Sequence, residues 1–161
     1  MECTVYEIVQ SLSDYAEVIM IAIGCDHGGY ELKLEIMKHL DKRGIEYVDC
    51  GTHSTASVDY PVYAKKVCES ILSGESEKGI LICGTGIGIS IVANKQKGIR
   101  CALCGDCFSA EATRQHNDTN VVALGARVTG PGLAIKIVDT FLDTPFSNDE
   151  RHLNRIRQIE D

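Results

Sequence analysis

The sequence has no excess of positive charge and no run of basic residues. Its 161 residues include 16 lysines and arginines against 23 aspartates and glutamates, which gives a formal net charge of −7. Proteins that bind nucleic acid usually present a basic patch to the phosphates. We therefore expect no nucleic-acid partner, and we interpret the negative charge as an aid to solubility.

Long apolar runs and a secretion signal are also missing. No apolar run approaches the roughly 20 residues that span a bilayer, and residues 1–20 lack the basic start and small-residue cleavage site of a signal peptide. These absences predict a cytoplasmic protein with no membrane partner. The eight cysteines are then expected to be reduced thiols, some of them buried in strands, rather than a disulfide framework.

What the sequence does contain is an alternation of short β-branched runs with longer stretches of helical periodicity. This pattern is typical of parallel strands joined by crossover helices. The strand candidates are mostly apolar throughout, as expected for a sheet that is covered on both faces. We predict an α/β fold with strands at residues 21–25, 46–50, 79–83, 100–104 and 121–125 and helices at residues 29–43, 61–72, 87–96, 106–115, 132–142 and 147–160.

One domain is expected at residues 20–161, preceded by an extension of unknown role. Residues 1–19 carry apolar side chains at roughly helical spacing, which fits an extra helix, a frayed tail or the product of an upstream start. The last predicted helix is largely polar, and its only aliphatic residues are Leu153, Ile156 and Ile159. Such a narrow apolar stripe favours docking on a partner subunit.

The strongest single feature is a strand that turns through three glycines into a helix, at residues 82–90. Glycines allow a bound group to approach the backbone closely, and a helix start offers unpaired N–H groups with a partial positive charge. We therefore expect an anion at this loop. The same field favours a thiolate at Cys83, and a thiolate can act as a base. The alternative for Cys83 is a small buried hydrophobic residue at a strand end.

Three other kinds of site can be compared with the sequence. A dinucleotide site needs Gly-x-Gly-x-x-Gly, and Ile89 stands at the third glycine position, although Asp106 keeps this interpretation open as a ribose-binding acid. A Walker loop is excluded because no Gly-Lys-Ser/Thr tripeptide occurs. Cys101, Cys104 and Cys107 imitate the spacing of an iron–sulfur motif, but the first two lie three apart on a predicted strand and should face opposite ways.

Polar side chains elsewhere have both ordinary and functional interpretations. Ligands of an open parallel sheet bind beyond the carboxyl ends of its strands, where Asp26 and His27 follow the first strand and Arg127 follows the fifth. Asp26 and His27 can instead cap the first helix. Arg151 and Arg155 are four residues apart on one helical face, which suits either a phosphate clamp or a solvated surface.

Four motifs in order resemble those of the type B ribose-5-phosphate isomerases of the ribose/galactose isomerase family. They are residues 24–29 (Gly-Cys-Asp-His-Gly-Gly), 59–61 (Asp-Tyr-Pro), 82–90 and 114–120 (Arg-Gln-His-Asn-Asp-Thr-Asn). The resemblance runs from about residue 20 to the C-terminus. It implies a Rossmann-like three-layer sandwich with a five-stranded parallel sheet, no metal and no cofactor. It also implies a homodimer or homotetramer with active sites shared between subunits.

The resemblance further implies a reaction and a role for each matching residue. The reaction is the interconversion of D-ribose 5-phosphate and D-ribulose 5-phosphate, in the pentose phosphate pathway, through an enediolate. Cys83 would be the base, the loop N–H groups would stabilise the enediolate oxygen, and His116 would open the sugar ring. The implied catalytic set is Cys83, His116, Asp26 and Thr85, and the implied substrate-binding set is His27, Tyr60, Gly84, Gly86, Ile87, Gly88, Asn117, Arg127, Arg151 and Arg155.

Within this set, His27, Arg127, Arg151 and Arg155 would bind the phosphate, and Asn117 and Arg127 are candidates for delivery by the partner chain. Two alternatives to the pentose phosphate isomerase stay open. The nearer one is an isomerase of a hexose phosphate, such as allose 6-phosphate or galactose 6-phosphate. The more distant one is a non-catalytic nucleotide-binding or thiol redox module, which the glycine loop, Asp106 and the eight cysteines would suit.

Overall fold

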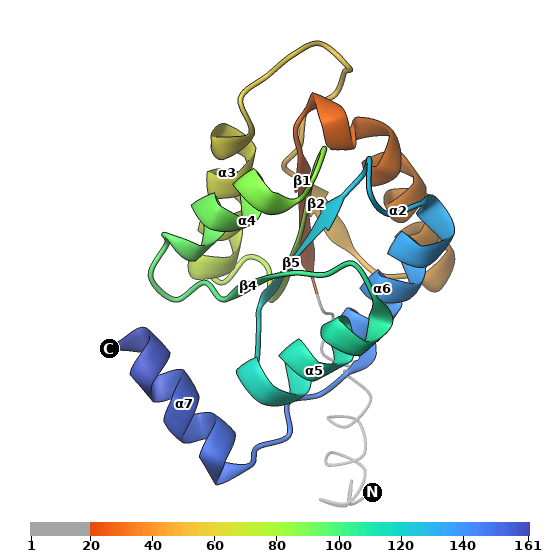
Figure 1. Ribbon diagram of the computed structural model, residues 1–161. Coiled ribbons are helices and arrows are strands. Elements are labelled where there is room, and N and C mark those ends of the chain that lie inside the picture. The colour runs from red at the N-terminus through yellow and green to blue at the C-terminus, as the bar shows by residue number, and fades with distance from the viewer. Residues whose placement is uncertain (1–19) are drawn as a thin grey trace, which may run out of the picture.

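Five parallel strands form one sheet in the computed structural model, which describes residues 20–161 (Figure 1). The strand order is β2-β1-β3-β5-β4, so the chain reverses its direction of winding between β1 and β3. This arrangement confirms the predicted α/β fold. The strands are β1 (Ile21–Cys25), β2 (Tyr47–Asp49), β3 (Lys78–Cys83), β4 (Cys101–Leu103) and β5 (Val121–Gly125), and the helices are η1 (His27–Gly29), α2 (Tyr30–Arg43), α3 (Tyr60–Leu72), α4 (Ile87–Asn94), α5 (Cys107–Asn117), α6 (Pro131–Asp143) and α7 (Glu150–Glu160).

The central strands are buried and the edge strands are shorter than predicted. Apart from Lys78, β1, β3 and β5 consist of aliphatic residues, cysteine and glycine, and every residue in them is buried. The edge strands were expected at residues 46–50 and 100–104, but β2 and β4 each pair with a single neighbour over three residues. Their side chains are accordingly only half-buried or exposed.

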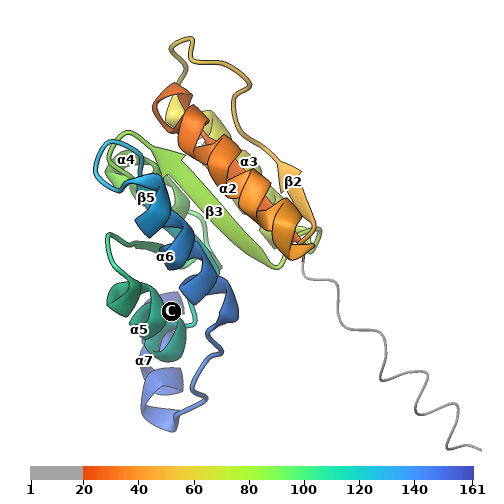
Figure 2. The ribbon, with the colours of Figure 1, turned by 90° about the vertical axis from the view of Figure 1, so that its right-hand side faces the viewer.

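Two helical layers cover the sheet, as expected for a Rossmann-like three-layer sandwich (Figures 1 and 2). Successive side chains of a strand point to opposite faces, and β5 shows this clearly. Val122 and Leu124 join the core under α2, α5 and α6, whereas Val121 and Ala123 join the core under α3 and α4. Cys83 faces the α3/α4 layer.

Capping residues move several helix ends away from their predicted positions. The last helix was expected from residue 147, but Asn148 has a left-handed backbone (φ 56°) and the Asp149 carboxylate accepts a hydrogen bond from the Arg151 N–H. The helix therefore begins at Glu150. In the same way Asp106, which was expected inside a helix, caps α5 by accepting from the Ser109 N–H.

Within residues 20–161, no helix is long and apolar enough to cross a membrane. The predicted extension at residues 1–19 lies outside the described residues.

Candidate active site

The glycine-rich loop places the Cys83 thiol at the N-terminus of α4. Cys83 is the last residue of β3, and its Sγ accepts a hydrogen bond of 3.1 Å from the Gly86 N–H. Gly86 has φ +77°, and a Cβ there would lie 2.8 Å from the carbonyl carbon of Leu124. Only glycine satisfies both conditions. The loop thus turns a backbone donor towards sulfur while the thiol stays 5% exposed.

Arg127 lies beside this loop in the same chain. The Ala126 N–H donates to the Cys83 carbonyl and the Arg127 N–H to the Gly84 carbonyl, each at 2.9 Å. A Cβ on Gly84 would lie 3.4 Å from Nη1 of Arg127. The guanidinium group therefore borders the loop without a partner chain. Within the loop, the Thr85 hydroxyl accepts a hydrogen bond of 3.2 Å from the Ile87 N–H.

Asp26 and His27 follow β1 at the same edge of the sheet. Asp26 is buried, and its Oδ1 accepts hydrogen bonds from the N–H groups of Gly28 (2.9 Å) and Gly29 (3.1 Å). Asp26 therefore caps the short helix η1, in agreement with the capping interpretation. A Cβ on Gly28 would lie 3.1 Å from the Gly84 nitrogen, so the short helix η1 packs directly on the Cys83 loop.

Tyr60 closes the loop from the other helical layer. It is the first residue of α3, and a Cβ on Gly88 would lie 2.7 Å from its Cζ and 2.9 Å from its hydroxyl oxygen. The phenol group therefore rests on the first turn of α4, beside the loop, and remains 38% exposed.

A cleft of about 820 Å³ opens on the α2/α6 side of this edge. Its lining includes one imidazole and one guanidinium group that can meet an anion, those of His27 and Arg127. Its lining is His27, Gly28, Glu31, Leu32, Leu34, Glu35, Thr55, Ala126, Arg127, Thr129 and Pro131. The volume is within the range of small-molecule sites.

His116 and Asn117 do not join this group of residues. They end α5, which begins just after β4 and runs back along the sheet, so they lie near the amino ends of β4 and β5 (Figure 1). The Asn117 carbonyl accepts from Nε of Arg100, the residue before β4, at 2.9 Å. A single chain therefore keeps His116 and Asn117 on the opposite edge of the sheet from Cys83.

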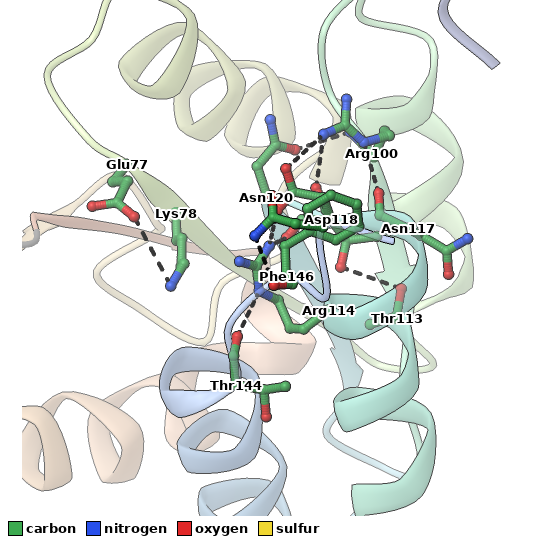
Figure 3. A network of polar contacts seen from close by, with 12 residues as sticks. Glu77, Lys78, Arg100, Thr113, Arg114, Asn117, Asp118, Asn120, Thr144 and Phe146 are labelled. Atoms are coloured by element: carbon green, nitrogen blue, oxygen red, sulfur yellow. Dashed lines mark hydrogen bonds and ion pairs between the residues drawn. The ribbon is translucent and has the colours of Figure 1, made fainter. Parts of the chain in front are cut away.

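The turn after His116 is held by a dense polar network (Figure 3). Asp118 has a left-handed backbone (φ 44°), and its carbonyl and carboxylate contact two arginines. Arg100 donates to the Asp118 carbonyl at 2.8 Å, and Arg114 donates to the carboxylate at 2.9 Å. Arg114 also donates to the carbonyls of Thr119 and Thr144. The network fixes the backbone that carries His116 and Asn117.

Arg151 and Arg155 also lie far from Cys83, on α7. This helix packs against α5 and extends beyond the sheet (Figures 1 and 2). Both arginines are exposed, and Arg151 Nε contacts the Asp149 carboxylate at 3.1 Å. Within one chain the two arginines therefore lie on the same side of the molecule as His116, away from the Cys83 loop.

Sequence reasoning missed His152, whose ring packs against that of His116 at a tilt of 42°. The ring centroids are 4.5 Å apart, and His152 Nδ1 lies 2.8 Å from the Ser147 hydroxyl oxygen. His152 is buried, and burial together with the charge of His116 lowers its pKa from the ordinary value of 6.5. The spacing of His152 with Ile156 and Ile159 was the available signal, because it places His152 on the apolar stripe of α7.

Three other cysteines of the described residues are buried in the core. Burial raises the pKa of Cys25, Cys68 and Cys104 to about 11. Cys101 and Cys104 pack in opposite layers of the core, so they do not face a common cluster. Residues 20–161 contain no group of three or more histidine, cysteine or acidic side chains arranged to hold a metal ion.

Comparisons with known proteins identify the family. The model of the family described as "Ribose/Galactose Isomerase" matches residues 21–159. Ribose-5-phosphate isomerase B of Escherichia coli is 52% identical over 139 residues, which are 86% of this chain and 93% of that protein. Galactose-6-phosphate isomerase subunit LacB of Clostridium acetobutylicum is 38% identical over 143 residues, 89% of this chain and 83% of that protein.

A solved structure gives the same answer in three dimensions. Ribose-5-phosphate isomerase B of Clostridium thermocellum superposes with a TM-score of 0.86 at 53% identity, covering 88% of this chain and 95% of that chain. Sequence identity of this size over nearly the whole fold extends well beyond a shared architecture. The chain belongs to the ribose/galactose isomerase family.

Proposed function

We propose that the protein interconverts D-ribose 5-phosphate and D-ribulose 5-phosphate, with Cys83 as the base. The observation that carries this proposal is the hydrogen bond from the Gly86 N–H to the Cys83 sulfur, inside the glycine loop and at a helix N-terminus. An N–H group that donates to sulfur favours its anionic form. At the same edge of the sheet, on its α2/α6 side, the cleft with His27 and Arg127 offers a place for the phosphate.

The chemistry moves one proton between two carbons. The Cys83 thiolate removes the proton from C2 of the open-chain aldose, and the electron pair left behind forms the C1–C2 double bond of an enediolate. Negative charge then gathers on the oxygen of C1, where N–H groups of Gly84 to Gly88 stabilise it. A proton passes from the C2 hydroxyl to that oxygen, and Cys83 returns its proton to C1, which leaves a ketone at C2.

The other site residues prepare the substrate for this step. The pentose phosphate rests as a ring, and His116 protonates the ring oxygen while Asp26 assists transfer of the hydroxyl proton. Tyr60 lines the sugar, Thr85 supports the loop, and Asn117 contacts the enediolate side of the sugar. His27 and Arg127 bind the phosphate together with Arg151 and Arg155, whose planar groups match phosphate oxygens.

A second copy of the chain completes the site in this proposal. His116, Asn117 and the α7 arginines lie at the sheet edge opposite to Cys83, and most of α7 is exposed. A homodimer, or a homotetramer built from such dimers, would bring these residues of one chain to the Cys83 loop of the other. Residues 20–161 then act as the isomerase domain, and α7 is the element that docks on the partner.

Replacement of Cys83 tests the proposed base. Cys83→Ala should lower kcat for ribose 5-phosphate by about 10²- to 10⁴-fold, the usual value for a lost general base. Cys68→Ala is the matched control, because it removes a thiol from α3 outside the site and should keep kcat unchanged. A folded Cys83→Ala protein with undiminished turnover would refute the assignment.

The hexose phosphate isomerase is retained as a second candidate because a galactose-6-phosphate isomerase subunit is a relative over most of the chain. The two substrates differ by one carbon unit, so the ratio of kcat/KM values measures whether the pocket has room for it. We expect a higher kcat/KM for ribose 5-phosphate than for allose 6-phosphate or galactose 6-phosphate. The reverse order would favour the hexose phosphate.

A further inference from the structure

The loop from residue 50 to residue 59, here called the 50–59 loop, connects β2 to α3 and arches over the carboxyl edge of the sheet (Figures 1 and 2). None of its residues belongs to the catalytic set. Thr55 nevertheless lines the same cleft as His27 and Arg127. The loop is therefore placed to influence how those two residues meet an anion.

A fully buried lysine anchors the beginning of the loop. The Lys33 side chain, on α2, is 0% exposed. Its Nζ donates to both carboxylate oxygens of Asp49 at 2.8 and 2.7 Å and to the Thr52 carbonyl at 2.8 Å. Three donors thus meet three acceptors, which compensates the cost of removing the charge from water.

The anchored turn is also fitted to the end of β1. Asp49 Oδ1 accepts from the Gly51 N–H at 2.9 Å, and the Thr52 N–H donates to the Cys25 carbonyl at 3.1 Å. A Cβ on Gly51 would lie 2.8 Å from the Cys25 nitrogen and 3.0 Å from Cδ of Lys33. The start of the loop is thereby held against the residue that precedes Asp26 and His27.

The far end of the loop contacts His27 itself. The Val58 N–H donates to His27 Nδ1 at 3.2 Å. A backbone N–H can only donate, so Nδ1 must be the ring nitrogen that carries the lone pair. In a neutral imidazole the proton then resides on Nε2. His27 is therefore held in the tautomer whose Nε2–H is free to donate to a ligand.

We propose that the 50–59 loop positions His27 for phosphate binding. The Val58 N–H selects the Nε2–H tautomer of His27, which donates to a phosphate oxygen in the cleft. The Lys33–Asp49 ion pair keeps the loop in place, so Lys33 and Asp49 are positioning residues. The identity of the ligand rests on the proposed function, whereas the tautomer of His27 does not.

The Val58 hydrogen bond is tested by a pair of substitutions. Val58→Pro removes the N–H, and Val58→Ala replaces the same side chain but keeps the N–H. ¹⁵N NMR of the imidazole nitrogens, assigned with His27→Gln, reports the tautomer in the free protein. We expect an Nε2–H tautomer in the wild type and in Val58→Ala, and a mixture of tautomers in Val58→Pro. An Nδ1–H tautomer in the wild type would overturn the proposal.

The anchor is tested by replacing the whole ion pair. Lys33→Met combined with Asp49→Leu leaves no unpaired buried charge, so the chain should still fold. Loss of one hydrogen bond to a charged ligand corresponds to about a tenfold change in affinity. We therefore expect the KM for ribose 5-phosphate and the Kd for inorganic phosphate to rise about tenfold, with kcat largely retained. Lys38→Met, which removes an exposed lysine from α2, should change neither value.

The outcomes separate this inference from the proposed function. If the Lys33→Met/Asp49→Leu variant matches the wild type in phosphate affinity and in the tautomer of His27, the proposed positioning role of the ion pair is overturned, whatever the turnover. A wild-type protein that shows the Nε2–H tautomer and binds inorganic phosphate, yet does not isomerise ribose 5-phosphate, would refute the proposed reaction and leave the positioning of His27 intact.

Discussion

Two variants that are each inactive should regain activity when they share one oligomer. Cys83 ends β3, whereas His116 lies near the amino end of β5. Because β5 has five residues and a strand rises about 3.3 Å per residue, roughly 16 Å of strand separates the two edges. Neither side chain spans that length, so Cys83→Ala and His116→Ala should damage different halves of a shared site.

The expected recovery follows from symmetry. In a two-fold dimer each site takes Cys83 from one chain and His116 from the other. A mixed dimer of the two variants then has one site with both defects and one intact site. Equal amounts that mix at random place half of the chains in mixed dimers, so about one quarter of the wild-type activity should return.

The assay is turnover of ribose 5-phosphate after joint refolding of the two variants, with different affinity tags to demonstrate mixed dimers. The matched control mixes wild type with the double variant Cys83→Ala/His116→Ala. A shared site predicts about one quarter of the wild-type activity in both mixtures, whereas a site within one chain predicts no activity in the first and about half in the control. The second pattern would refute the shared site.

Two further predictions concern stability. Gly86→Ala combines a left-handed backbone with a Cβ 2.8 Å from the Leu124 carbonyl carbon, so the free energy of unfolding in urea should fall by more than the backbone cost alone, which is about 1–2 kcal/mol. The control is Gly44→Ala, with φ +66° and nothing within 4 Å of the new Cβ, which should show the backbone cost only. Equal losses in the two variants would contradict the close approach at Gly86. Because the pKa of His152 is lowered from 6.5 in the folded protein, the unfolded chain binds a proton at His152 more readily. The contribution of neutral His152 to stability is therefore complete above pH 6.5 and is lost as the pH falls below that value. The urea midpoint, measured from about pH 8 to pH 5, should fall less steeply in His152→Gln than in the wild type, and identical slopes would contradict this.

The fold was predictable because the composition of the central strands already indicates that they are buried. β1, β3 and β5 are apolar on both faces, and the helices between them show a clear stripe, such as Leu32, Ile36 and Leu40 on α2. The ends were less predictable. Whether Ser147 or Glu150 begins a helix depends on the left-handed Asn148 and on the Asp149 cap, which are choices between local hydrogen bonds of similar free energy.

The candidate site was predictable only in part. Residues that follow β1, β3 and β5 share one edge because parallel strands end together, and this rule brought Asp26, Cys83 and Arg127 together. His116 was identified by its motif, and the motif does not determine at which edge of the sheet the residue lies. The return path of α5 carries it to the opposite edge, and the contact between the rings of His152 and His116 depends on tertiary packing between two helices.

The ion pair between Arg100 and Glu160 joins the residue before β4 to the penultimate residue of the chain. Arg100 also donates hydrogen bonds to the carbonyls of Asn117 and Asp118. Through Arg100, the last turn of α7 is therefore linked to the backbone next to His116. Removal of Glu160 should therefore free Arg100 and loosen the backbone that carries His116.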